Sequence, residues 1–276
     1  MLHERIYLNE NDDRVYIDTY VPNDRTKLHD AILVIPGGGY IAVCTEREGE
    51  PIALDFVARD YAAFVLNYRV GKGDRFPSQL LDAGAAMLHI RNNAEKYGVN
   101  PKRVFAVGFS AGGHLCGSIA SMYAYAEVKE AYGEEYLKVK PTGAILSYPV
   151  TVMDTEAHYG SFINLTGKEP NEFTEKDYDK YSLDRVVNSD TAPMYIWHTR
   201  TDDLVPVEGS IRLALALSRC GVNYMLHIAP YGPHGLALSN KVTLTPPLSD
   251  VFAQSLMSDW TAKADEWFAT LPDSEF

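Results

Sequence analysis

Positive charge, cysteine and long apolar runs are all scarce in this chain of 276 residues. Lysine and arginine number 25 against 37 aspartates and glutamates, which gives a net charge of −12. A partner with a phosphate backbone requires clustered positive charge, and so does docking on anionic lipid. No stretch approaches the roughly 20 apolar residues of a membrane span. We therefore expect neither nucleic acid nor a membrane as a partner.

The three cysteines, Cys44, Cys116 and Cys220, are far apart and odd in number. Their spacing matches neither a CxxC motif nor a disulfide framework. Reduced thiols in a cytoplasm are the simplest explanation, and the first residues lack the apolar run of a secretory signal. We therefore predict a cytoplasmic protein, in which the sequon Asn164-Leu165-Thr166 has no meaning as a glycosylation site. The sequence leaves the oligomeric state open, a homo-oligomer included.

Hydrophobic residues make up 46% of the chain, which is enough for a large buried core. Short apolar or β-branched runs alternate with segments of helical periodicity. The strand-like runs cover residues 14–18, 31–35, 63–66, 104–107, 144–146, 194–197 and 224–228. This alternation predicts an α/β fold with a mostly parallel central sheet and helices on both faces. In such sheets the functional site lies beyond the carboxyl ends of the strands.

Four of the intervening segments predict helices whose apolar stripes pack on the core. The stripes are Ile52 with Phe56 and Ala53 with Val57; Leu81, Ala85 and Leu88, in a helix opened by Pro77 and ending near Gly98; Ile211, Ala214 and Leu215; and Leu256, Trp260, Ala264 and Trp267. The polar, charged stretch around 151–190 interrupts the alternation. It is too short for a core of its own, so we expect one domain over 1–276 with a cap-like insertion over the site.

A G-x-S-x-G motif, Gly108 to Gly112, directly follows the run 104–107 and leads into a helical run that begins near Ala111. This strand–turn–helix context is that of a nucleophile elbow, in which Ser110 has a strained backbone and its hydroxyl stands above the sheet edge. The glycines leave room for the tight turn. A plain Gly-Ser turn is the alternative, and the flanking strand and helix make it the weaker one.

Three consecutive glycines, Gly37, Gly38 and Gly39, follow the run 31–35. No side chains obstruct their N–H groups, so we expect one or two of them to form an oxyanion hole with the N–H of Ala111. A simple turn and a phosphate-binding loop are the competing interpretations. The phosphate loop is disfavoured, because no G-x-G-x-x-G pattern is present and no Lys-Ser or Lys-Thr follows.

The candidate base among eight histidines is His234, whose loop leaves the carboxyl end of the last strand-like run, where it can reach Ser110. His114 is poorly placed, because it lies one helical turn beyond Ser110. Either Asp202 or Asp203, beyond another strand-like run, can accept a hydrogen bond from His234. The remaining aspartate then serves as a solvated or helix-capping carboxylate. The order Ser, Asp, His is the one that α/β-hydrolases use.

The chain resembles the α/β-hydrolase superfamily, and more narrowly its bacterial acetyl esterase and acetylxylan esterase-like members. The matching residues are 36–40, 68–69, 108–113, 197–206 and 232–236. In these relatives the acid stands three residues before the Val of a D-x-x-V-P run, which implies Asp202, with Asp203 second. The common lipase motif has a histidine where this chain has Pro36, and this difference argues against lipid-esterase and arylformamidase functions.

The resemblance implies an α/β-hydrolase fold and a serine esterase that forms an acyl-enzyme without metal or cofactor. The polar insertion does not resemble a greasy lid, so we expect short acyl groups, and the resemblance favours acetylated sugars as the small-molecule substrate. Two alternatives stay open: a serine peptidase or amidase on the same fold, and a catalytically inactive binding protein. The first usually adds a large gating domain, and the second typically lacks the nucleophile or the base.

Overall fold

The computed structural model describes residues 1–24, 26–71, 73–153, 158–244 and 256–276. Within these ranges the chain forms an eight-stranded sheet in the order β1-β2-β4-β3-β5-β6-β7-β8. The strands from β4 through β8 in that order are parallel, whereas β1 and β2 pair antiparallel at one edge. The bounds are β1 Arg5–Tyr7, β2 Tyr16–Tyr20, β3 His29–Ile35, β4 Ala62–Asn67, β5 Val99–Phe109, β6 Ala144–Ser147, β7 Met194–Thr199 and β8 Tyr224–Ala229. The predicted, mostly parallel sheet is confirmed.

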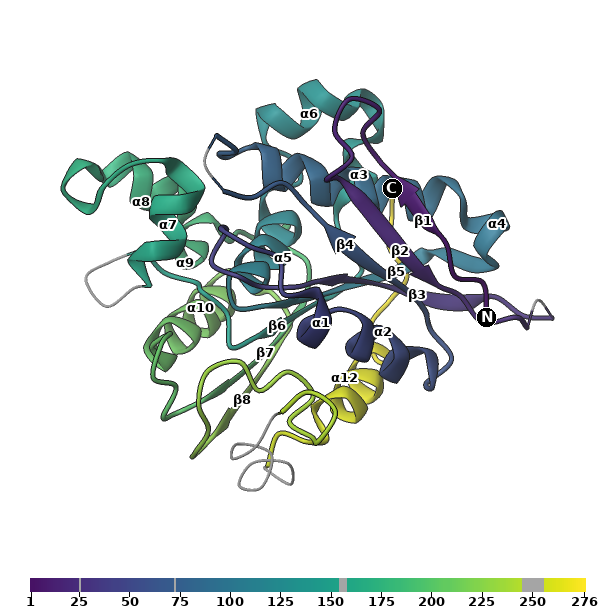
Figure 1. Cartoon of the computed structure of the whole chain (residues 1–276). Helices are drawn as coiled ribbons and strands as arrows, with labels where there is room; N and C mark the ends of the chain where they lie inside the picture. Colours follow the sequence, from purple (N-terminus) through teal and green to yellow (C-terminus); the bar gives the residue numbers. More distant parts are fainter. Residues whose placement is uncertain (25, 72, 154–157, 245–255) are drawn as a thin grey trace.

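Helices cover both faces of the sheet (Figure 1). One face packs against α2 (Glu50–Val57) and α12 (Trp260–Phe268), and the other against α3 (Ser78–Asn92), α5 (Ala111–Met122) and α10 (Val207–Arg219). The shorter helices between β3 and β6 are α1 Thr45–Glu48, α4 Ala94–Tyr97, α6 Ala126–Tyr132 and the 3₁₀ helix η1 Gly133–Val139. The predicted cover on both faces is therefore confirmed.

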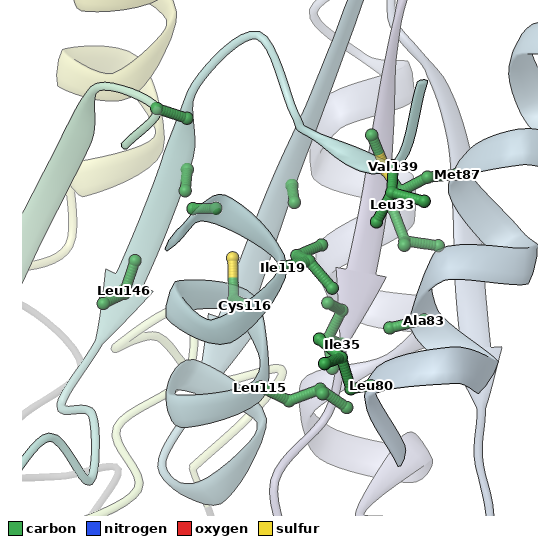
Figure 2. Packing of buried hydrophobic residues seen from close by; sticks show 14 of the residues in the cluster. Leu33, Ile35, Leu80, Ala83, Met87, Leu115, Cys116, Ile119, Val139 and Leu146 are labelled. Atoms are coloured by element: carbon green, nitrogen blue, oxygen red, sulfur yellow. The ribbon is translucent and has the colours of Figure 1, made fainter. Parts of the chain in front are cut away.

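The alternation of strand side chains explains how β3 serves two cores. Leu33 and Ile35 point to the face covered by α3 and α5, whereas Ile32 and Val34 belong to the core on the opposite face. Figure 2 shows Leu33 and Ile35 beside Leu80 of α3 and Ile119 of α5. Each fully buried aliphatic side chain of this kind contributes about 1.5–3 kcal/mol of transfer free energy. This packing fixes the position of α5, at whose N-terminus Ser110 lies.

The predicted stripe on α10 is wrong. Ile211 and Leu215 are 46% and 49% exposed, and of the three predicted residues only Ala214 is buried. The buried face carries Leu213, Ala214 and Leu217. Two adjacent apolar stripes exist on this helix, and contact with β7, β8 and α9 (Leu183–Val186) selects one of them.

The other predicted stripes differ in smaller ways. On α2 the residues Ile52, Ala53 and Phe56 are buried as expected, and Val57 is partly buried. Leu256 precedes α12 and is exposed, and Trp267 is only partly buried. The buried residues in and just before α12 are Met257, Trp260, Ala264 and Phe268. The buried residues of α3 include Leu80, Ala83, Met87, Leu88 and Ile90.

The predicted insertion consists of short helices between β6 and β7, and its residues 154–157 lie outside the described residues. Their bounds are α7 Tyr159–Thr166, η2 Pro170–Glu172, α8 Glu175–Tyr181 and α9 Leu183–Val186. Phe162 and Leu165 of α7 are buried and belong to the same core as β3 and α5. The insertion therefore shares a core with the sheet. Among the helices of the described ranges, none is long and apolar enough to cross a membrane.

Candidate active site

Three candidate catalytic residues follow the carboxyl ends of three parallel strands. Ser110 follows β5, Asp202 lies beyond β7, and His234 lies beyond β8. Parallel strands end at the same edge of a sheet, so loops far apart in sequence meet there. The glycine loop that begins with Gly37 follows β3 and reaches this edge as well.

Ser110 has a strained backbone, with φ 53° and ψ −119°. Residues other than glycine rarely adopt a positive φ, and such strain concentrates at functional sites. The turn is tight, because a Cβ on Gly108 would lie 2.1 Å from the carbonyl oxygen of Gly112. The N–H of Ser110 donates to the carbonyl of Ser147 at 3.0 Å, which fixes the turn to β6. The strain that the motif predicts is therefore present.

The side chains of Ser110, His234 and Asp202 form one hydrogen-bonded series. Ser110 Oγ lies 2.9 Å from His234 Nε2, and His234 Nδ1 lies 2.8 Å from Asp202 Oδ2. A carboxylate only accepts hydrogen bonds, so Nδ1 carries the proton and Nε2 is free to accept the proton of the Ser110 hydroxyl. Such an arrangement can activate a serine hydroxyl as a nucleophile.

Asp202 has a buried side chain that is held on several sides. Its Oδ1 accepts the N–H groups of Leu204 and Val205 at 2.9 and 2.8 Å, and its Oδ2 also lies 3.1 Å from His198 Nε2. Burial favours a higher pKa for the Asp202 carboxyl, but the hydrogen bonds from His198 and His234 hold that pKa below its ordinary value. Asp202 is therefore a carboxylate at neutral pH.

Asp203 has a different role in the same loop. Its Oδ1 accepts the backbone N–H of His234 at 3.1 Å, and the residue is exposed. Asp202 therefore hydrogen-bonds the imidazole ring of His234, whereas Asp203 hydrogen-bonds the backbone of the same residue.

One predicted oxyanion donor, Gly37, is wrong. Its N–H donates to Oε2 of Glu48 at 2.8 Å and cannot also point at a substrate. In the described part of the chain no acceptor faces the N–H of Gly38, Gly39 or Ala111. Ala111 is the first residue of α5, where N–H groups have no intrahelical partner and the helix dipole favours negative charge.

Glu48, on α1, is a residue that the sequence analysis missed. Its side chain is 2% exposed, and Oε1 accepts the hydroxyl of Tyr148 at 2.9 Å. The Tyr148 oxygen in turn accepts the N–H of Ala237 at 3.1 Å, and its ring meets the His234 ring edge-on with centroids 5.0 Å apart. Glu48 therefore links the glycine loop to the histidine loop. Nothing in the pattern around Glu48 distinguishes it from a solvated helix carboxylate.

A cavity of about 340 Å³ opens onto Ser110 and His234. It is lined by Gly38, Gly39, Ile41, Cys44, Arg47, Glu48, Ser110, His158, Gly160, Asn164, Leu204 and His234. Its volume lies within the range of small-molecule sites. Three of its residues, His158, Gly160 and Asn164, come from the insertion, and the sequence analysis did not assign His158 any role.

His114 lies apart from this cavity. It is buried on α5, where Nδ1 accepts the hydroxyl of Tyr40 at 2.8 Å and Nε2 donates to the carbonyl of Tyr181 at 2.8 Å. Burial lowers the pKa of His114 to about 4, so the ring is neutral. Both ring nitrogens are engaged, and His114 is not the base. No cluster of histidine, cysteine or acidic side chains suited to a metal ion is found among the described residues.

Comparisons with known proteins identify the family of the chain. The BD-FAE family profile matches residues 17–217. An endo-1,4-beta-xylanase B of Butyrivibrio fibrisolvens is 38% identical over 80% of this chain, and an acetylxylan esterase of Xylanibacter ruminicola is 35% identical over 74%. The chain spans only 34% and 40% of the length of these two relatives.

A solved structure covers nearly the whole chain. The acetyl ester-xyloside bifunctional hydrolase of Caldicellulosiruptor lactoaceticus is 32% identical, with a TM-score of 0.82, and the match covers 97% of this chain and 96% of that one. With the family profile matching most of the chain and the parallel sheet in place, the chain belongs to the BD-FAE family and is an esterase-like α/β-hydrolase.

Proposed function

We propose that the chain is a serine esterase that removes short acyl groups, acetyl foremost, from carbohydrate alcohols through an acyl-enzyme on Ser110. The observation that carries this proposal is the series from Asp202 through His234 to Ser110, with contacts of 2.8 and 2.9 Å. A base within hydrogen-bond reach of a serine, itself oriented by a carboxylate, is the arrangement that acyl transfer requires.

In the acylation step, Ser110 Oγ attacks the ester carbonyl carbon while its proton passes to His234 Nε2. The carbonyl oxygen becomes an oxyanion, for which the N–H groups of Ala111 and of Gly38 or Gly39 are the available donors. Asp202 stabilises the imidazolium that forms. The tetrahedral intermediate then expels the alcohol oxygen, which takes the proton from His234 Nε2, and the acyl group stays on Ser110.

In the deacylation step, a water molecule attacks the acyl carbonyl and gives its proton to His234. Collapse of the second intermediate returns that proton to Ser110 Oγ and releases the carboxylic acid. The net change is ester plus water to acid plus alcohol, so no oxidant or other co-reactant enters the reaction.

The walls of the cavity support a short acyl group. Among the described residues that line it, Ile41 and Leu204 are the aliphatic side chains, and both are at least half exposed. A long acyl chain gains binding free energy only where apolar surface is removed from water, at about 25 cal/mol per Å². The other lining residues are glycines, Cys44 and residues with polar side chains, so no further aliphatic side chain extends the cavity for a long acyl chain.

The names of the relatives support a carbohydrate alcohol. One matched relative is an acetylxylan esterase, and the matched solved structure is an acetyl ester-xyloside bifunctional hydrolase. Because acetylated sugars carry free hydroxyl groups beside the ester, they suit a cavity whose walls carry histidine, asparagine and arginine side chains.

The test is hydrolysis of p-nitrophenyl esters by the wild type and Ser110→Ala. We expect kcat to fall by about 10⁶ in the variant and fluorophosphonate labelling of the wild type to be lost. Acetate should be cleaved faster than decanoate, and acetate should be released from acetylated oligosaccharides. Retention of most esterase activity by the variant would contradict the mechanism. Faster cleavage of decanoate would contradict the acyl preference, and sustained peptide turnover would favour the peptidase.

A further inference from the structure

Helix α7 of the insertion presents a row of polar side chains to the glycine loop. His158, which precedes the helix, is followed at three-residue intervals by Ser161 and Asn164. Residues spaced in this way lie near one face of a helix. The Nδ2 amide of Asn164 donates to the carbonyl of Gly39 at 2.8 Å. Ser161 Oγ and His158 Cε1 lie 3.9 and 4.0 Å from the position that a Cβ on Gly39 would occupy.

Other contacts of α7 fix the helix to the core. Phe162 is buried and meets the His114 ring edge-on, with centroids 5.3 Å apart. Arg75 Nη1 donates to the carbonyl of Asn164 at 2.7 Å, and the N–H of Phe76 donates to that of Leu165 at 2.9 Å. The polar row is therefore held against the cavity by the body of the fold.

His158 has the chemistry of a hydrogen-bonding group that the reaction steps above do not use. Its half-buried ring lines the cavity together with Ser110 and His234, and Nδ1 lies 2.9 Å from Ser161 Oγ. Burial lowers the pKa of His158 below its ordinary value, so the neutral ring predominates at pH 7. With Nδ1 engaged, a neutral imidazole offers Nε2 as one further donor or acceptor.

The position of His158 relates it to the alcohol half of the ester. The leaving oxygen must reach His234 Nε2 to be protonated, whereas the carbonyl oxygen must point to the amides of the oxyanion loop. His158 lies near both: it lines the same cavity as His234, and its Cε1 lies 4.0 Å from the position that a Cβ on Gly39 would occupy. A substituent on the carbon next to the leaving oxygen extends from this region into the cavity, where His158 forms part of the wall.

We propose that His158 determines alcohol specificity, its Nε2 forming a hydrogen bond with a hydroxyl beside the acylated oxygen of a polyhydroxylated alcohol. Ser161 orients the ring, and Asn164 holds the row at the oxyanion loop. The inference rests on the proposed esterase function and adds to it a selection for vicinal hydroxyl groups. A site that hydrogen-bonds a substrate hydroxyl discriminates against analogues that lack it.

The test compares two esters of similar size, monoacetylated methyl xyloside and cyclohexyl acetate, which differ in the hydroxyl groups beside the ester. We expect His158→Phe to lower kcat/KM for the sugar acetate about tenfold, the effect of one net hydrogen bond, and to change that for cyclohexyl acetate less than twofold. His158→Gln, which keeps a hydrogen-bonding group, should recover part of the loss. Fluorophosphonate titration gives the concentration of active protein for each variant.

His89→Phe is the matched control, because His89 is also half-buried and lies on α3 outside the cavity. It should leave the ratio of the two kcat/KM values unchanged. An equal loss on both esters, or no loss on either, would overturn the role of His158 while leaving the esterase function intact. If His158→Phe does not fold, His158→Ala takes its place under the same criteria. Failure of the wild type to hydrolyse either ester would instead contradict the proposed function itself.

Discussion

Glu48 accepts the N–H of Gly37 through Oε2 at 2.8 Å, which places a buried carboxylate directly behind the loop that faces Ser110. A Cβ on Gly37 would lie 3.0 Å from the Cβ of Ser110, so the two loops are in close contact. A negative charge here opposes a developing oxyanion, and hydrogen bonds from Gly37 and Tyr148 offset part of that charge. We interpret Glu48 as the group that holds the glycine loop in shape.

Replacement of Glu48 tests this interpretation. Glu48→Ala leaves the Gly37 N–H and the Tyr148 hydroxyl without their acceptor, so the loop that carries the proposed oxyanion donors loses its support. We expect kcat for p-nitrophenyl acetate to fall about 100-fold, the lower end of the cost of losing an oxyanion donor, with little change in KM. The kcat of Glu48→Gln should lie between those of the wild type and Glu48→Ala, because its amide oxygen can still accept one hydrogen bond.

The matched control for Glu48 is Glu46→Ala, which removes an exposed carboxylate from the same helix. It should have wild-type kinetics. Equal losses in the two alanine variants would mean that charge near the site matters and the contact with Gly37 does not.

Asp202→Asn and Asp203→Asn separate the two neighbouring carboxylates. An asparagine at position 202 can present an amide to His234 Nδ1 and so favour the wrong tautomer, and kcat should fall about 10⁴-fold. Asp203 holds only the backbone of His234, so its substitution should cost less than tenfold. Steady-state kinetics of both variants on one aryl acetate measure the two losses in kcat. A larger loss in Asp203→Asn than in Asp202→Asn would assign the acid to Asp203.

His114 makes the stability of the fold depend on pH. Its pKa is about 4 in the folded chain against an ordinary value of 6.5, so the unfolded chain binds the proton first as the pH falls. The stabilisation is complete above pH 6.5 and is lost between 6.5 and 4. One pKa unit corresponds to about 1.4 kcal/mol, so the loss amounts to about 3 kcal/mol. Urea unfolding of His114→Gln should show a shallower pH dependence in this range, and parallel curves for both proteins would refute it.

The nucleophile turn depends on the absence of a side chain at Gly112. A Cβ there would lie 2.3 Å from the carbonyl oxygen of Ile35, which is backbone and cannot move aside. We expect Gly112→Ala to reduce the free energy of unfolding by about 3 kcal/mol, at the upper end for overpacking. Gly221→Ala is the control, because its Cβ would meet open space and only its φ of 72°, at the end of α10, adds a cost, of about 1 kcal/mol. Equal losses would contradict the steric argument.

The edge where Ser110, Asp202 and His234 meet was predictable, because each residue follows a recognisable apolar run and parallel strands end together. The hydrogen bond from the Gly37 N–H to Glu48 could not be predicted. Its acceptor, Glu48, is tied to Tyr148 a hundred residues further along the chain, and no local pattern encodes such a contact. On α10 two apolar stripes compete, and only tertiary contact with β7, β8 and α9 decides between them. The edge strand β1, of three residues, is too short to show a period.

The placement of α7 has a consequence for how such a protein can change its substrate. Helix α7 belongs to the insertion between β6 and β7 and lies outside the sheet. Ser110, Asp202 and His234 instead belong to loops that follow strands of the sheet. The residues that we propose to select the alcohol and those that we propose to cleave the ester thus come from separate segments of the chain. Exchange of one segment between relatives would redirect selectivity without rebuilding the chemistry.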